Sequence, residues 1–167
     1  MGNEENINKE LPACGKTGVS TVNGQVVTIN DNTCRELIRE AINMLNYSYT
    51  PYSNFKVGAA LLGADNKIYT GCNVENAAYT PTNCAERTAF FKAVSTGVKD
   101  FAAIAIVGGR DGKLESYCSP CGVCRQVMME FCDPDTFYVI LAKSEEDYWV
   151  YSLSEIMPMG FSPKDLK

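Results

Sequence analysis

The chain of 167 residues contains no histidine. This absence excludes every site that needs an imidazole, including the Ser-His-Asp triad, the Cys-His dyad and the HExxH zinc site. A metal site would have to be built from cysteine and carboxylate ligands. A general acid or base would have to be a carboxylate, a tyrosine, a lysine or a thiol.

Basic charge and long apolar runs are also scarce. The formal net charge is -5, which argues against a nucleic acid as the partner because nucleic-acid-binding proteins usually present a basic face. No apolar run approaches the ~18 residues of a membrane-spanning helix, and the acidic N-terminus lacks the basic region of a secretory signal. We therefore expect a cytoplasmic protein that binds neither a membrane nor a nucleic acid.

Cysteine, by contrast, is abundant. Eight cysteines in a reducing compartment predict metal ligands, reactive thiols or small buried side chains rather than a disulfide framework. The apolar fraction of 46% predicts a globular fold, and the length suits one domain. Residues 1–30 show no clear period and are expected to form a partly ordered N-terminal extension, followed by a single domain over residues 31–167.

The periodicity of the remaining chain predicts alternating helices and strands. A capping box at Thr33 to Glu36 predicts the start of the first helix, and Pro51 limits its end. Later helices are expected over 83–95 and 121–132, with a short one after Pro163, and strands over 55–62, 67–74, 101–107, 137–142 and 149–153. This order predicts an α/β layer fold with a mixed sheet.

Three cysteines at two predicted helix starts indicate a metal site. Cys121 and Cys124 are three residues apart, so their sulfurs point to one side of a first helical turn, where the helix dipole favours thiolates. Cys84 begins another helix and can supply a third sulfur. Three protein ligands leave a fourth tetrahedral position for water, which is typical of catalytic zinc, and zinc lowers the pKa of that water to roughly 7.

Glu86 lies two residues after Cys84, near the predicted metal and free to move protons. A ligand-x-Glu stretch followed by Pro-Cys-x-x-Cys matches the signature of zinc-dependent nucleobase deaminases, including their three-cysteine variant. A lone Cys-x-x-Cys would be weak support, whereas the combination on two helices is specific.

Cys118 leaves alternatives open. The C-x-x-C-x-x-C run from Cys118 to Cys124, together with Cys84, could form a closed structural four-cysteine zinc site. An iron–sulfur site would need its fourth cysteine at Met128. A redox dithiol would leave Glu86 without a role. We favour the catalytic zinc.

Several further segments occur in an order that is characteristic of one family. The chain resembles the short-type cytidine deaminases from about Thr50 to the C-terminus. The segments that carry the resemblance are PYSNF at 51–55, VGAAL at 57–61, GCNVENA at 71–77, CAERTA at 84–89 and SPCGVCRQV at 119–127. The resemblance implies a three-layer α/β/α sandwich with a mixed five-stranded sheet, and hydrolysis of cytidine and deoxycytidine to uridine and deoxyuridine with release of ammonia in pyrimidine salvage.

The same resemblance implies roles for individual residues. One Zn²⁺ per chain would be held by Cys84, Cys121 and Cys124. Glu86 would take a proton from water, deliver one to N3 of the ring and later protonate the leaving amine. Arg87 would donate hydrogen bonds to ligand sulfurs, which is reasonable because three thiolates on Zn²⁺ leave a net charge of -1.

Substrate contacts follow from the family pattern as well. Asn73 and Glu75 would hold the ribose hydroxyls, and their alternation along a strand places both side chains on one face. Phe55 would pack beside the nucleoside. The Ala85 N–H would bind the base carbonyl, and the Ser119 carbonyl would accept from the amino group.

Short members of the family form homotetramers with active sites at subunit boundaries. Phe161 matches the position whose ring reaches a neighbour's substrate.

Among rival functions, a blasticidin-type deaminase is the nearest, although Asn73 and Glu75 favour ordinary nucleosides. A non-catalytic structural zinc module is a rival of another class, and the net charge disfavours polynucleotide editing.

Overall fold

A computed structural model describes residues 18–22 and 25–166 of the chain. Its centre is a five-stranded sheet in the order β4-β3-β5-β6-β7. These strands span Phe55–Gly63 (β3), Ile68–Cys72 (β4), Phe101–Arg110 (β5), Tyr138–Ala142 (β6) and Tyr148–Ser152 (β7). The β5 and β6 strands are parallel and the other neighbours are antiparallel, so the predicted mixed sheet is confirmed.

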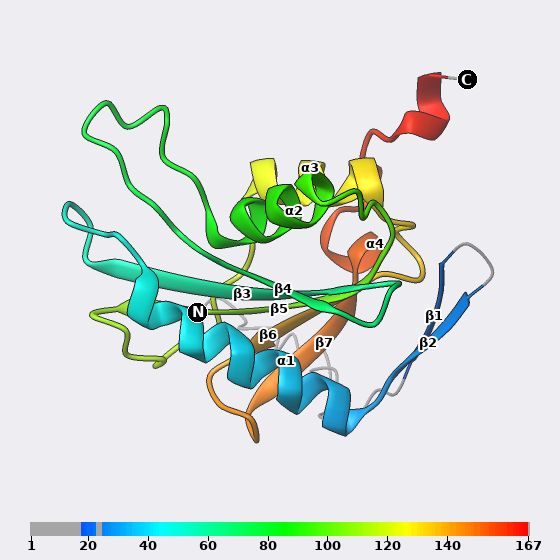
Figure 1. The fold of residues 1–167 in the computed structure, drawn as a ribbon, viewed down its shortest axis with the longest axis horizontal. Helices are drawn as coiled ribbons and strands as arrows, with labels where there is room; N and C mark the ends of the chain where they lie inside the picture. The colour runs from blue at the N-terminus through cyan, green and yellow to red at the C-terminus, as the bar shows by residue number, and fades with distance from the viewer. Residues whose placement is uncertain (1–17, 23–24, 167) are drawn as a thin grey trace, which may run out of the picture.

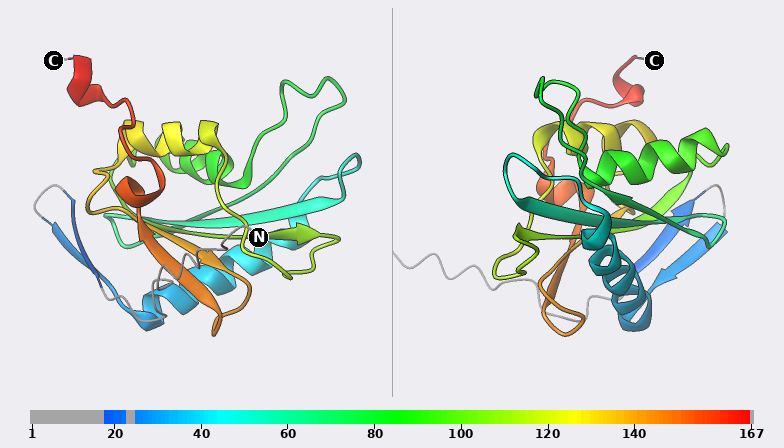
Figure 2. Two further views of the ribbon diagram at one scale, coloured as in Figure 1. Left: turned by 180° about the vertical axis from the view of Figure 1, so that it is seen from behind. Right: turned by 60° about the vertical axis from the view of Figure 1, so that its left-hand side comes forward.

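Helices cover both faces of this sheet (Figures 1 and 2). The α1 helix (Asp31–Asn43) lies on one face, and α2 (Ala85–Ser95) and α3 (Gly122–Phe131) lie on the other. The three-layer α/β/α arrangement expected from the resemblance is therefore present. The central strand β5 is buried from Phe101 to Gly109, because helices shield both of its faces and an apolar run satisfies both cores.

The start of α1 differs from the sequence prediction. Asn30, and not Thr33, caps the helix: its Oδ1 atom accepts from the Thr33 N–H at 2.9 Å. The predicted capping box at Thr33 is wrong because α1 begins at Asp31, so Thr33 lies within its first turn and the Thr33 N–H is itself an orphan donor that Asn30 satisfies. The helix also ends earlier, at Asn43, and is followed by the 3₁₀ turn η1 (Met44–Tyr47).

A β-hairpin precedes α1, where the sequence reading expected only an extension. Strands β1 (Gly18–Val22) and β2 (Gln25–Ile29) pair with each other in a separate two-stranded sheet beside the start of α1 (Figure 1). Val27 and Ile29 are buried in the core on the α1 side of the large sheet. The hairpin thus contributes to the main core, whereas residues 1–17 and 23–24 lie outside the described part of the chain.

Strand β5 continues past residue 107, where the predicted strand ended, through Gly108 and Gly109 to Arg110. A side chain at Gly108 would meet the Cys118 sulfur at 2.9 Å, and one at Gly109 would meet the Lys113 carbonyl at 1.8 Å. Glycine therefore lets the loop that follows β5 fold back closely against the strand.

Two short elements complete the chain. The α4 turn (Leu153–Ile156) follows β7 directly and has a capping box at Ser152, and η2 (Pro163–Leu166) is the short C-terminal helix expected after Pro163. Among the residues that the structure describes, no helix combines the length and apolar character needed to cross a membrane.

Candidate active site

Three cysteine sulfurs meet where α2 and α3 begin. Cys84 is the N-cap residue of α2, Cys121 is the N-cap residue of α3, and Cys124 lies in the first turn of α3. The Cys84 and Cys121 sulfurs are 3.9 Å apart, the Cys121 and Cys124 sulfurs are 3.5 Å apart, and all three lie within 4.8 Å of one another. The two helix N-termini add partial positive charge, which favours thiolates and hence metal binding.

The charges around these sulfurs already favour a thiolate at Cys84. Its pKa falls to about 5, because the Cys124 thiol and the Arg87 guanidinium both donate to its sulfur. The pKa of Cys124 is raised correspondingly, because its proton is held by the Cys84 sulfur and because its own sulfur is buried. The two cysteines thus share one proton, which a thiophilic cation would displace.

Arg87, on α2, contacts one sulfur of the cluster. Its Nη2 atom donates to the Cys84 sulfur at 3.6 Å and to the Thr82 carbonyl at 3.1 Å. Its Nε atom is buried and has no hydrogen-bond partner among the described residues, so it remains a spare donor. Three thiols and a partly buried guanidinium with a spare donor fit a zinc ion, whose excess thiolate charge the guanidinium would offset.

Glu86 is buried beside the sulfurs with 4% of its surface exposed. Its pKa rises to about 7, chiefly because burial penalises the charged carboxylate and further because the Cys84 thiolate is near. A carboxyl group with a pKa near neutrality can both accept and release a proton, which is the property a general acid–base requires.

A cavity of about 190 Å³ joins these groups to polar side chains from other segments. The residues lining it are Val57, Asn73, Glu75, Thr82, Asn83, Cys84, Glu86, Cys118, Ser119 and Cys121. It therefore brings together seven of the residues singled out from the sequence, while Cys124 is buried and does not line the cavity. Thr82 and Asn83 were not predicted, and their position directly before Cys84 is the signal that could have identified them.

Asn73 lies just beyond the end of β4 and is held by the backbone of β3. Its Oδ1 atom accepts from the Val57 N–H and its Nδ2 atom donates to the Phe55 carbonyl, both at 2.8 Å. Each of these amide atoms can form one further hydrogen bond, so the side chain can contact a ligand without leaving its support.

Glu75 organises the loop before β3. Its carboxylate accepts from the N–H groups of Tyr52 and Ser53 at 2.9 and 3.2 Å, and from the Ser53 hydroxyl. The hydroxyl bond, followed by the two backbone bonds, lowers the pKa of Glu75. An ionised carboxylate in this position can accept hydrogen bonds from a ligand's hydroxyl groups.

Two predicted aromatic residues do not line this cavity in the single chain. Phe55, the first residue of β3, is 38% exposed, and Phe161 in the C-terminal segment is 57% exposed. The Phe161 carbonyl accepts from the Gln126 side-chain amide at 2.9 Å.

The backbone N–H of Ala85 is a further donor predicted for the substrate. Ala85 is the first residue of α2, and an N–H group at a helix N-terminus has no intrahelical partner.

Cys118 is separate from the sulfur cluster, although it lines the same cavity. It is half-buried against Gly108, and burial raises its pKa to about 12, so it stays protonated. Within the described part of the chain, the candidate metal site therefore comprises three cysteines, and every cysteine there is free of disulfides. This geometry argues against the closed four-cysteine alternative.

Comparisons with known proteins agree with a zinc-binding site in this chain. The family described as "Cytidine and deoxycytidylate deaminase zinc-binding region" matches residues 31–140. The cytidine deaminase of Sporosarcina psychrophila is 49% identical over 131 residues, which cover 78% of this chain and 93% of the relative. The cytidine deaminase of Halalkalibacterium halodurans is 47% identical over 130 residues, covering 78% of this chain and 95% of the relative.

A solved structure agrees with these relatives. The crystal structure of cytidine deaminase from Burkholderia pseudomallei superposes with a TM-score of 0.68 and 46% sequence identity, covering 75% of this chain and 97% of the other. The hairpin β1–β2 ends at Ile29, before the first residue of the family match.

Proposed function

Since this chain belongs to the cytidine and deoxycytidylate deaminase family, we propose that it hydrolyses cytidine and deoxycytidine to uridine and deoxyuridine, releasing ammonia. One observation carries the proposal: a buried glutamate and two thiols of the three-cysteine cluster line one cavity together with polar side chains that suit a sugar. This reaction needs an activated water, a group that moves protons and contacts that orient the nucleoside.

Zn²⁺ is the cofactor, one ion per chain, and Cys84, Cys121 and Cys124 would hold it. When bound, zinc supplies a water that is acidic enough to lose a proton near neutral pH. Arg87 would keep the electron-rich sulfurs from weakening that effect, because its guanidinium donates to the Cys84 sulfur.

Glu86 would carry the protons of the reaction. It would accept a proton from the attacking water and give it to N3 of the ring. It would then accept the second proton of that water from the hydroxyl at C4, which becomes the carbonyl, and pass it to the amino group, which leaves as ammonia. Its burial supports this role, because a carboxyl group with a pKa near 7 exchanges protons at little cost near neutral pH.

The nucleoside would be oriented by groups around the cavity. Asn73 and Glu75 would bind the ribose hydroxyls, the Ala85 N–H would bind the base carbonyl, and the Ser119 carbonyl would accept from the amino group. Support comes from Asn73, Glu75 and Ser119 lining the cavity that contains Glu86. Phe55 would contribute an apolar wall beside the nucleoside.

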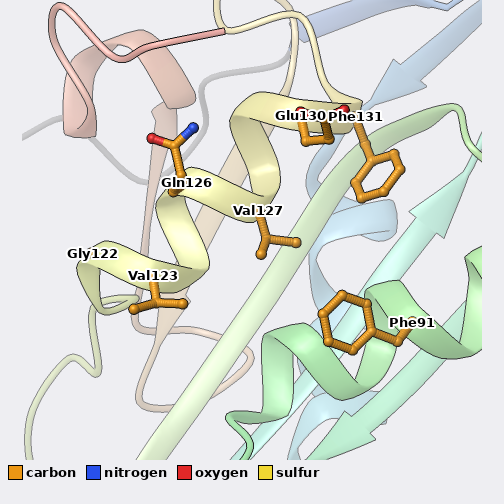
Figure 3. Close-up of a pocket in the computed structure, with 7 residues that line it drawn as sticks. All are labelled: Phe91, Gly122, Val123, Gln126, Val127, Glu130 and Phe131. Carbon is orange, nitrogen blue, oxygen red and sulfur yellow. The ribbon is translucent and has the colours of Figure 1, made fainter. Parts of the chain in front are cut away.

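We further propose that the active form is a homotetramer with shared sites. The loop between β4 and α2 projects from the body (Figure 1), and its Tyr79 is 75% exposed beside Tyr52. A second apolar surface lies between α2 and α3, where Phe91, Val123 and others line a groove of about 450 Å³ (Figure 3). Exposed tyrosine and apolar side chains of this kind are enriched at interfaces between subunits.

Phe161 would complete the cavity of a neighbouring subunit, which its exposure and its absence from the cavity of its own chain support. Mixing two inactive variants tests this. Glu86→Gln and Phe161→Ala tetramers, dissociated and reassembled together, should regain activity because some mixed sites receive intact Glu86 from one chain and Phe161 from another. Activity no higher than the sum of the separate variants would refute sharing.

The place of the reaction is pyrimidine salvage in the cytoplasm. The described cysteines form no disulfide, which supports a reducing compartment, because a three-thiol metal site stays functional only while its sulfurs remain reduced. A deaminase of another cytosine nucleoside, such as blasticidin S, is the alternative within the family.

The decisive experiment follows the ultraviolet absorbance of cytidine incubated with the zinc-loaded protein. We expect loss of cytosine absorbance with release of ammonia, and a decrease of at least ~100-fold in kcat for Glu86→Gln with zinc content unchanged. Glu36→Gln, an exposed glutamate on α1 at the opposite face of the sheet, is the matched control and should retain full activity. Absence of turnover by the wild type with cytidine would refute the proposal.

A further inference from the structure

The segment that carries Asn73 and Glu75 is joined to the metal-binding end of α2 by one backbone pair. The Val74 N–H donates to the Asn83 carbonyl and the Asn83 N–H donates to the Val74 carbonyl, both at 2.9 Å. Asn83 directly precedes Cys84. The position of Asn83 therefore helps to set the distance between this segment and the candidate zinc ligand.

Asn83 is in turn held by a side chain one turn into α2. Its Nδ2 atom donates to the Thr88 hydroxyl oxygen at 3.1 Å. The same hydroxyl donates to the Cys84 carbonyl, also at 3.1 Å. Thr88 thus connects the residue that holds the Asn73–Glu75 segment with the residue that provides a metal ligand.

Thr88 has little freedom to adopt another arrangement. Helix α2 packs directly on β4 at Gly71, where an added Cβ would lie 3.0 Å from the Thr88 Cβ and 2.3 Å from the Ala85 carbonyl oxygen. This close approach confines the Thr88 side chain between the helix and the strand that leads into Asn73. A confined hydroxyl that uses both its donor and an acceptor position is suited to hold two segments in a defined alignment.

We infer that Thr88 is a positioning residue, which acts through Asn83 to align the ribose-binding segment with the zinc-binding end of α2. The inference rests on the proposed function, in which Asn73 and Glu75 bind the ribose hydroxyls. Thr88 itself does not line the cavity, so its effect is transmitted by the Asn83–Val74 backbone pair.

The test replaces the hydroxyl without changing the shape of the side chain. Thr88→Val should raise KM for cytidine by about fivefold with little change in kcat, the effect of losing one hydrogen bond. The same variant should hardly change kcat/KM for 2′,3′-dideoxycytidine, which lacks the hydroxyls that depend on the alignment. Thr88→Ser keeps the hydroxyl and should restore the wild-type KM.

Thr96→Val is the matched control, because the Thr96 hydroxyl donates to the Ala93 carbonyl at 2.8 Å at the other end of the same helix. It should leave both substrates unaffected. An equal loss with both substrates, an effect of similar size in Thr96→Val, or no rescue by Thr88→Ser would each overturn the inference.

Hydrogen exchange gives a measurement that does not depend on turnover. In the zinc-loaded protein, the amide protons of Val74 and Asn83 should exchange faster in Thr88→Val than in the wild type, and remain unchanged in Thr96→Val. Unchanged protection in Thr88→Val would overturn the inference even if cytidine is deaminated. Faster exchange in a protein that does not deaminate cytidine would support the alignment role and refute only the proposed function.

Discussion

The Arg87 guanidinium donates to the Cys84 sulfur at 3.6 Å, from a position three residues further along the same helix. This contact depends on helical geometry alone, because residues three apart lie on one face of the helix. It also places positive charge beside a cluster of thiols that would together hold one Zn²⁺ ion.

Replacing Arg87 with glutamine should therefore weaken zinc binding. We expect a decrease of about 10–100-fold in zinc affinity, the usual effect of losing a residue that supports a metal ligand. Competition with a chromophoric chelator measures it. Arg39→Gln is the control, since the Arg39 side chain is 57% exposed and pairs with Glu145 far from the cluster. Equal zinc affinity in the two variants would contradict the role of Arg87.

Cys118 and Cys124 should differ sharply as zinc ligands. Because Cys118 lies outside the three-sulfur cluster, Cys118→Ala should retain one zinc per chain. Cys124→Ala should lose most of its zinc, because it removes one of three ligands. Metal analysis of the purified variants distinguishes the two, and loss of zinc from Cys118→Ala would revive the four-cysteine site.

The hairpin before α1 should contribute to the stability of the whole domain. Ile29 is fully buried, so Ile29→Ala should lower the free energy of unfolding by about 2–5 kcal/mol. Val26, on the same strand, is 66% exposed, and Val26→Ala should change the free energy of unfolding by less than about 0.5 kcal/mol. Urea denaturation of the zinc-loaded proteins gives both values. Similar small effects would mean that residues 18–29 act as a tolerated tail.

Acid should weaken the contact between α1 and β7. The Tyr148 hydroxyl donates to Asp31, and this bond, followed by that from Arg35, lowers the pKa of the Asp31 carboxyl. A lowered folded-state pKa stabilises the protein above the unfolded pKa of about 3.9, and the stabilisation disappears as the pH falls through the folded value.

Tyr148→Phe should therefore destabilise the protein at neutral pH, and should do so progressively less as the pH falls below about 3.9, the pKa of the carboxyl in the unfolded chain. Urea denaturation over a series of pH values measures the change. In an Asp31→Asn background, the effect of Tyr148→Phe should be independent of pH, because the titrating group has been removed. If Tyr148→Phe destabilised the protein equally at every pH with Asp31 present, the coupling between Tyr148 and the Asp31 carboxylate would be disproved.

The order and type of most elements could be predicted from the sequence, because they depend on local periodicity. The apolar run of β5 and the helical stripe of α1 indicated buried elements of the correct kind. Their ends were predicted less well: Asn30 caps α1 because the chain enters the helix one turn earlier, and β5 continues through Gly108 because the loop packs against it. The hairpin was missed, although Asn23-Gly24 between valine-rich stretches is a hairpin signal.

The ligand types and their local spacing were determined by the sequence alone. Cys121 and Cys124 face one side of a helix because they are three residues apart, and Glu86 accompanies Cys84 because it follows within the same turn. The lack of histidine already required a metal site built from thiols or carboxylates.

Only the tertiary structure decided which distant groups meet and in which charge state. The sheet order brings α2 and α3 side by side. The Cys84 sulfur therefore lies 3.9 Å from the sulfur of Cys121, which is 37 positions away in the sequence. Packing against Gly108 keeps Cys118 out of the cluster, and burial raises the pKa of Glu86 to about 7. These properties depend on long-range packing and desolvation, which no local pattern of residues encodes.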